Sequence, residues 1–123
     1  MRDFHDHACA LLASQVREFV AGMVGEADPS RKGDGEALLG MFKSMGEKGF
    51  LGIPAPEPYG GGGGGWLETA VVVEEAAALQ PSLAAMLTAH YACLTGLLLL
   101  ASEHQAELFV PPWRGAKWQA GWP

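Results

Sequence analysis

Cysteine is scarce in this sequence: Cys9 and Cys93 are its only two cysteines in 123 residues. A small domain stapled by disulfide bonds needs a larger, even set. Both cysteines lie in apolar segments with helical spacing. The sequence therefore predicts two buried free thiols rather than a disulfide framework.

Basic residues are also few, with eight Lys and Arg against fourteen Asp and Glu and a net charge of −6. The longest basic cluster is Arg31-Lys32. Binding to nucleic acid or to an anionic membrane normally uses a basic patch, so we expect neither partner. The N-terminus, MRDFHDHA, carries charges where a secretory signal needs an apolar core. We therefore expect a cytoplasmic protein.

One long stretch has no formal charge at all. Leu83–Ala101 runs for nineteen residues and contains seven leucines. A surface helix keeps charges on its solvent side, so this stretch must be buried in protein or in lipid. The flanking charges are acidic, including Glu75 and Glu103, whereas a membrane span is oriented by nearby Lys or Arg. His90 and Tyr91 near its middle would also be costly in hydrocarbon. We predict a central helix buried in a soluble core.

Four further segments have apolar residues at steps of three and four, which indicates helices. They cover residues 4–27, 35–48, 66–79 and 103–110, the last ending at Pro111-Pro112. The predicted fold is all-α, a five-helix orthogonal or up-down bundle around the buried Leu83–Ala101 helix.

The segment Phe50–Gly65 reads FLGIPAPEPYGGGGGG, with three prolines and six consecutive glycines. Proline lacks an amide hydrogen and glycine is conformationally free, so we expect a flexible, extended connector. A phosphate-binding loop needs Lys-Ser or Lys-Thr after its last glycine, and a dinucleotide fingerprint needs a preceding strand. Trp66-Leu67 follows here, so no phosphate site is predicted.

Two other groups of polar residues could suggest a catalytic or metal site, but their spacing argues against both. Glu74 and Glu75 are adjacent, and adjacent helical side chains point about 100° apart, so we expect ion pairing rather than an acid/base pair. His5 and His7 are two residues apart and do not share a helix face. No metal site is predicted.

The order of several short motifs resembles the N-terminal helical domain of the acyl-CoA dehydrogenases, over Glu36 to Trp118. The motifs are Gly49-Phe50-Leu51-Gly52-Ile53-Pro54, Pro58-Tyr59-Gly60-Gly61, Val73-Glu74-Glu75, the apolar helix with His90, Glu103-His104-Gln105 and Phe109-Val110-Pro111. Two departures stand out. The glycine run is uninterrupted, and Gly121-Trp122-Pro123 stands where the family has Thr-Glu-Pro.

The resemblance implies a parent flavoenzyme in which a helical domain precedes a β domain and a C-terminal helical bundle. Such enzymes bind FAD between the latter two parts, use a carboxylate there as base, act on acyl-CoA and form homo-oligomers. We expect residues 1–118 to form the helical domain and 119–123 to begin the missing β domain. No catalytic or cofactor residue is assigned, and this chain alone should be inactive and bind no FAD. The alternative is a free-standing helical scaffold or partner-binding module.

The same resemblance implies that the central helix forms part of the acyl-pocket wall. The residues concerned are Ala89, His90, Cys93, Gly96 and Leu97. Ala89 and Gly96 leave room at i and i+7 on one helix face, with Cys93 between them. The alternative for these small residues is ordinary close helix packing.

Overall fold

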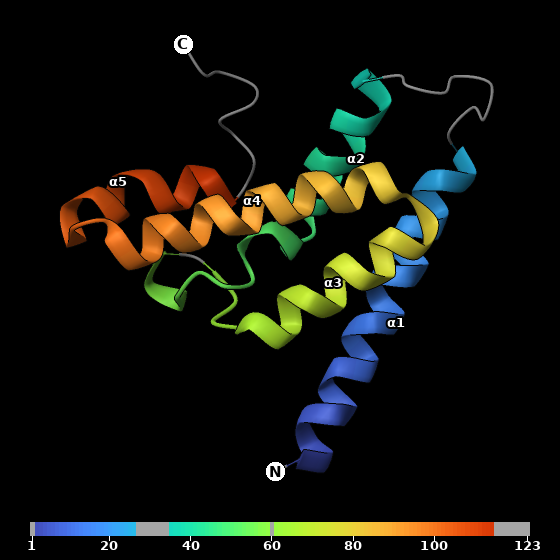
Figure 1. The fold of residues 1–123 in the computed structure, drawn as a ribbon, viewed down its shortest axis with the longest axis horizontal. Helices are drawn as coiled ribbons and strands as arrows, with labels where there is room; N and C mark the ends of the chain where they lie inside the picture. The colour runs from blue at the N-terminus through green and yellow to red at the C-terminus, as the bar shows by residue number, and fades with distance from the viewer. Residues whose placement is uncertain (1, 27–34, 60, 115–123) are drawn as a thin grey trace.

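The computed structural model describes residues 2–26, 35–59 and 61–114, and these residues contain helices and no strand (Figure 1). The elements are α1 (Arg2–Glu26), α2 (Gly35–Glu47), α3 (Trp66–Leu79), α4 (Pro81–Leu100) and α5 (Glu103–Arg114), with short 3₁₀ turns η1 (Phe50–Gly52) and η2 (Glu57–Tyr59). The predicted all-α fold with five helices is confirmed.

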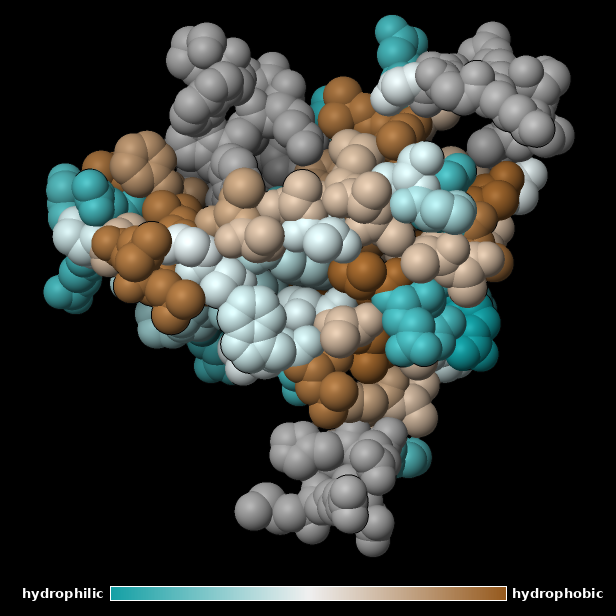
Figure 2. Space-filling model, viewed as in Figure 1, coloured by the Kyte–Doolittle hydropathy of each residue, from teal (hydrophilic) through white to brown (hydrophobic). Residues whose placement is uncertain are grey.

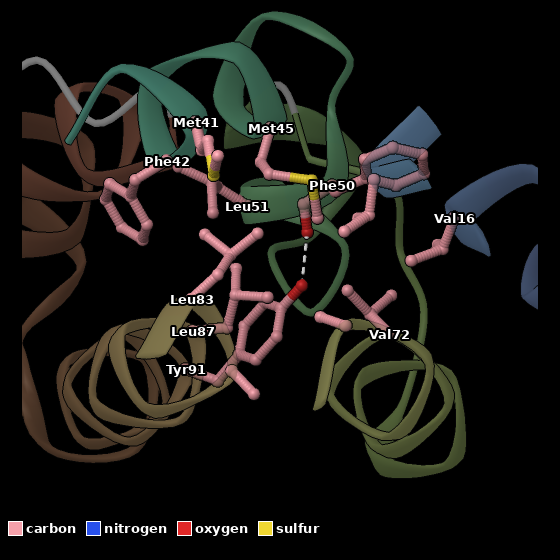
Figure 3. Packing of buried hydrophobic residues seen from close by; sticks show 13 residues of the cluster. Val16, Met41, Phe42, Met45, Phe50, Leu51, Val72, Leu83, Leu87 and Tyr91 are labelled. Carbon is pink, nitrogen blue, oxygen red and sulfur yellow. Dashed lines mark hydrogen bonds between the residues drawn. The ribbon is translucent and has the colours of Figure 1, made fainter. Parts of the chain in front are cut away.

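Helix α4 lies at the centre of this arrangement. It contacts α2, α3, α5 and η1, while α3 also packs along α1. In Figure 1, α5 runs back beside α4 and α1 crosses the bundle steeply. The main core draws on α1 to α4 and η1 (Figure 3). Its buried members are Val16, Val20, Met41, Phe42, Met45, Phe50, Leu51, Val72, Ala76, Leu83, Ala84, Leu87 and Tyr91.

Only one side of α4 is buried. The predicted central helix is therefore present, but it is not buried all round. Leu83, Leu87 and Leu94 are fully buried, whereas Leu99 and Leu100 are 75% and 87% exposed. The helix begins with Pro81 in its first turn, where the fixed φ of proline suits helix initiation. The apolar stretch thus supplies a core-facing side and an equally uncharged side that no described element covers.

By length and composition, α4 could also cross a membrane. It is the one helix of the described ranges that meets this test, with a mean hydropathy of 1.8 and a third of the tested window buried. The core helix of a soluble protein passes the same test. Its packing against three helices and η1 favours the core helix.

The glycine-rich segment is not the flexible, extended connector that its composition predicts. The amides of Gly61, Gly62, Gly63 and Gly64 donate to carbonyl groups between Gly52 and Pro56, at N···O distances of 2.7 to 3.1 Å. Gly63 has a φ of +67°, in the left-handed region that favours glycine. A Cβ atom on Gly61 would collide with the Ala55 carbonyl. The glycines therefore allow the chain to fold back closely on itself.

Ser102 and Gln105 cap the start of α5 with two reciprocal hydrogen bonds. The Ser102 amide donates to Gln105 Oε1 (2.9 Å), and the Gln105 amide donates to Ser102 Oγ (3.2 Å). This reciprocal pair is a capping box. The helix then continues to Arg114, so the predicted stop at Pro111-Pro112 is wrong. The φ of proline suits a helix, and its lost hydrogen bond falls here in the last turns, where little helix follows.

One ion pair ties α1 to α3. Arg17 Nε and Nη2 each donate to a carboxylate oxygen of Glu75 at 2.9 Å. The bidentate geometry matches the guanidinium fork to the carboxylate. The structural pairing predicted for the two glutamates is confirmed at Glu75.

The close approach of the glycine segment can be tested with Gly61→Ala. We expect the free energy of unfolding to fall by about 1–3 kcal/mol, the usual cost of overpacking, in urea denaturation. Gly40→Ala in α2 is the control, because a Cβ there meets nothing within 4 Å; it should stabilise by about 0.5–1 kcal/mol. Equal stabilities for Gly61→Ala and wild type would contradict the fold-back conformation.

Candidate functional site

Two polar side chains in the middle of α4 attach it to η1. His90 Nε2 lies 2.8 Å from the Leu51 carbonyl oxygen, and Tyr91 Oη lies 2.6 Å from that of Phe50 (Figure 3 shows the tyrosine bond). A carbonyl oxygen only accepts, so His90 Nε2 carries the hydrogen and donates. Both side chains are buried. The side-chain polar groups of His90 and Tyr91, which would be costly to bury alone, are therefore hydrogen-bonded to backbone carbonyl groups.

Burial sets the protonation state of both groups. It lowers the pKa of His90, an effect only partly opposed by the hydrogen bond to Leu51. The ring of Phe42 meets the imidazole edge-on at 5.5 Å between centroids. Burial also raises the pKa of the Tyr91 hydroxyl. At neutral pH, His90 is a neutral donor and Tyr91 keeps its proton.

The five residues predicted for the pocket wall fall on different sides of α4. Ala89 and Cys93 are exposed, Gly96 and Leu97 are half-buried, and His90 is buried against η1. Positions 89, 93 and 96 lie within about 60° of one another around the helix axis. The structure thus groups Ala89, Cys93 and Gly96 and places His90 on the core side.

The uncovered side of α4, here called the outer face, is small and uncharged. Its exposed residues are Pro81, Ser82, Ala85, Thr88, Ala89, Ala92, Cys93, Leu99 and Leu100, and the half-buried Gly96 lies among them. Figure 2 shows it as a pale brown band that darkens toward the C-terminal end of α4. Along most of this face the side chains are small, so they project little from the helix. Its chemistry suits contact with hydrocarbon or apolar protein, and it offers no charge for polar recognition.

Both cysteines are free, as predicted. Their predicted burial is wrong for Cys93, which is exposed, and Cys9 is half-buried. The cause is the one-sided burial of α4, because Cys93 lies on its outer face. An apolar sequence context did not distinguish the two sides of a helix that is apolar all round.

No described residues form a cradle for a phosphate-bearing cofactor or a metal. The amides of Gly61 to Gly64 are all occupied by carbonyl groups of their own loop. No cluster of three or more His, Cys, Asp or Glu is found in the part of the chain that the structure describes. Within the described residues, these four glycine amides are therefore not free to hold a phosphate group.

Glu75 of α3 is engaged by the guanidinium group of Arg17. The hydrogen bonds from Arg17 lower the pKa of Glu75, and burial opposes this only in part. Glu74 is exposed on the neighbouring position. A base working near neutral pH needs a raised carboxyl pKa, which is the opposite of the environment of Glu75.

The fold is an all-α domain in which no described element covers the outer face of α4. The family described as "Acyl-CoA dehydrogenase, N-terminal domain" matches residues 7–115. The chain therefore belongs to the acyl-CoA dehydrogenase family, as an N-terminal domain, and the resemblance seen in the motifs is confirmed. No curated protein and no solved structure gives a significant match.

Sequence reasoning missed the attachment of α4 to η1. His90 and Tyr91 carried the available signal, since a polar side chain inside an uncharged helix needs a hydrogen-bond partner when it is buried. For Tyr91, the acceptor is far away in the sequence. The partner is the Phe50 carbonyl, 41 residues earlier in the chain. Every residue has a carbonyl, so no side-chain pattern identifies this acceptor.

The Tyr91 bond can be tested with Tyr91→Phe. The substitution keeps the ring but leaves the buried Phe50 carbonyl without its donor, which costs about 1–3 kcal/mol. Denaturant unfolding should show this loss, whereas Tyr59→Phe, at a half-buried tyrosine of η2, should change stability by less than about 0.5 kcal/mol. Equal effects of the two substitutions would contradict the role of Tyr91.

His90 should make stability depend on pH. Its folded pKa lies below its unfolded value of about 6.5, so the unfolded state takes up a proton first as pH falls. The stabilisation is complete above pH 6.5 and is lost below it, at up to about 1.4 kcal/mol per pH unit. Unfolding between pH 7 and 5 should show this slope, and His90→Gln should reduce it. The control His104→Gln, at an exposed histidine, should leave the slope of stability against pH unchanged. The same unchanged slope in His90→Gln would refute the role of His90 in the pH dependence.

Proposed function

We propose that this chain acts as the N-terminal domain of an FAD-dependent acyl-CoA dehydrogenase, which introduces an α,β double bond into an acyl-CoA thioester. The observation that carries the proposal is the family match over residues 7–115. The uncovered apolar outer face of α4 supports it, because a domain of a larger enzyme needs such a surface for substrate or for its neighbours.

In this proposal, α4 contributes to the wall of the acyl pocket. Ala89, Cys93 and Gly96 on the outer face, with Leu97 at its border, are apolar and uncharged. Each methylene of an acyl chain gains about 0.8 kcal/mol on leaving water, and small wall residues leave space for that chain. His90 takes a positioning role, since it faces η1 and fixes the rotation of α4.

The reaction itself belongs to other parts of the parent enzyme. The family implies FAD, which accepts the electrons removed from the substrate, and a carboxylate base. We place both outside this chain, because Glu75 is engaged by Arg17 and the glycine amides are occupied. This chain alone should bind no FAD. The proposed domain boundary at residue 118 and the segment 119–123 lie outside the described residues.

The proposal extends to the setting of the parent protein. We propose a cytoplasmic homo-oligomer in fatty acid metabolism, without nucleic-acid or membrane partners. The net charge of −6 supports the last point, because anionic partners would be repelled. The exposed Leu99 and Leu100 also favour the second candidate, a helical module that binds a protein partner and has no activity.

Isolating the native protein from its source cells distinguishes the two candidates. The enzyme proposal predicts a mass well above 13.0 kDa, a visible flavin spectrum and oxidation of acyl-CoA by an artificial electron acceptor. A 13.0 kDa species without flavin that co-purifies with a protein partner would establish the binding module and refute the enzyme.

The pocket wall can be tested in the native enzyme with Ala89→Phe. The larger side chain should shift the preferred substrate to shorter acyl chains, measured as kcat/KM across a chain-length series, with flavin content unchanged. Each lost methylene contact should cost up to a few-fold in kcat/KM. Ala78→Phe, at an exposed alanine of α3, is the control. An unchanged chain-length profile in Ala89→Phe would count against the wall assignment.

A further inference from the structure

A surface groove lies between α1, α2 and η1, and none of its lining residues belongs to α4. Its volume is about 780 Å³, within the range of roughly 300–1,000 Å³ that small-molecule sites span. Phe19, Met23 and Phe50 supply its apolar surface. The proposed acyl-pocket wall uses a different surface, so nothing assigned so far accounts for this groove.

The aromatic part of the groove is preformed. The rings of Phe19 and Phe50 lie 5.8 Å apart between centroids, tilted by 56°. Phe50 is buried, and its carbonyl accepts the Tyr91 hydroxyl, so its backbone is held from the core side. Two tilted rings beside the Met23 thioether favour a flat aromatic ligand through ring and sulfur–aromatic contacts.

A positive charge lies over one ring of this aromatic surface. Lys48 Nζ lies 5.5 Å from the centroid of the Phe19 ring, a cation–π distance. Among the described residues, no carboxylate forms an ion pair with it. Glu18 also lines the groove, so the groove carries one formal charge of each sign. Apolar contact therefore supplies most of the affinity, and the ammonium selects a ligand with an anionic end.

A glycine keeps the groove open. Gly22 lines it, and a Cβ atom at this position meets nothing within 4 Å. A larger side chain at position 22 can therefore occupy the groove without striking the fold. This permits a test in which the site is filled while the helix is kept.

We infer that the groove binds a small aromatic carboxylate, with its ring against Phe19, Met23 and Phe50 and its carboxylate at Lys48. The inference does not depend on the proposed enzymatic function, because it uses residues of α1, α2, η1 and the turn at Lys48, and none of α4.

The experiment titrates the full chain with 2-naphthoate and follows backbone amide NMR shifts. The expected shifts centre on Phe19, Gly22 and Lys48. Gly22→Leu should weaken binding at least about tenfold, as a blocked apolar contact of this size predicts. Ala21→Leu is the matched control, because Ala21 is exposed and outside the lining; it should bind like wild type. Shifts confined to the outer face of α4, or equal affinity in Gly22→Leu and Ala21→Leu, would overturn the site.

The charge is tested separately, without filling the groove. Lys48→Gln should weaken 2-naphthoate binding by about threefold, the scale of one exposed charge contact, and leave binding of neutral 2-naphthalenemethanol unchanged. Lys43→Gln, in the preceding helix α2 and outside the lining, should change neither. Equal weakening of the acid and the alcohol by Lys48→Gln would show that the ammonium does not read the carboxylate and would overturn the ligand class.

Discussion

The structure depends on two consecutive backbone carbonyl groups, those of Phe50 and Leu51, which accept hydrogen bonds from Tyr91 and His90. An α4 without a charged side has only a weak hydrophobic preference for one rotation over another, set by its larger leucines against its small alanines. The two bonds reinforce that preference, because both donors must face η1. Fixing them turns Leu83, Leu87 and Leu94 into the core and presents the small residues of the outer face to the surface. The proposed function of α4 therefore rests on polar contacts inside an apolar core.

Much of the fold could be predicted because helix periodicity and chain breaks are local. The patterns in α1, α2 and α3 gave helices whose ends lie within a few residues of the observed ones, and Lys48-Gly49 marks the end of α2. The all-round apolar character of α4 predicted its length and its central place, but not which side is buried. That side depends on partners 39 and 41 residues away. For the same reason the predicted site included His90, which faces the core, together with Ala89 and Cys93, which face outward.

Composition misled where backbone geometry decides the structure. Six glycines normally indicate freedom, yet Gly61 to Gly64 are held by backbone hydrogen bonds and close contacts that a side chain would block. The groove beside Phe19 and Lys48 could not be seen in the sequence either, since its residues come from α1, α2, η1 and the turn at Lys48. In the sequence, nothing distinguishes Gly22 from any other glycine of an amphipathic helix. Only the structure shows the open space beside it.

The glycine fold-back also affects how the domain opens. Ordering glycine costs more backbone entropy than ordering any other residue, and this segment offsets that cost mainly with hydrogen bonds near the surface. We therefore expect this segment to open at a smaller free energy than the helices do. The carbonyl groups it binds begin at Gly52, directly after the two that hold α4. We therefore expect opening of this loop to reach the attachment of α4 before the helices unfold, which would couple the orientation of the outer face to the stability of the loop.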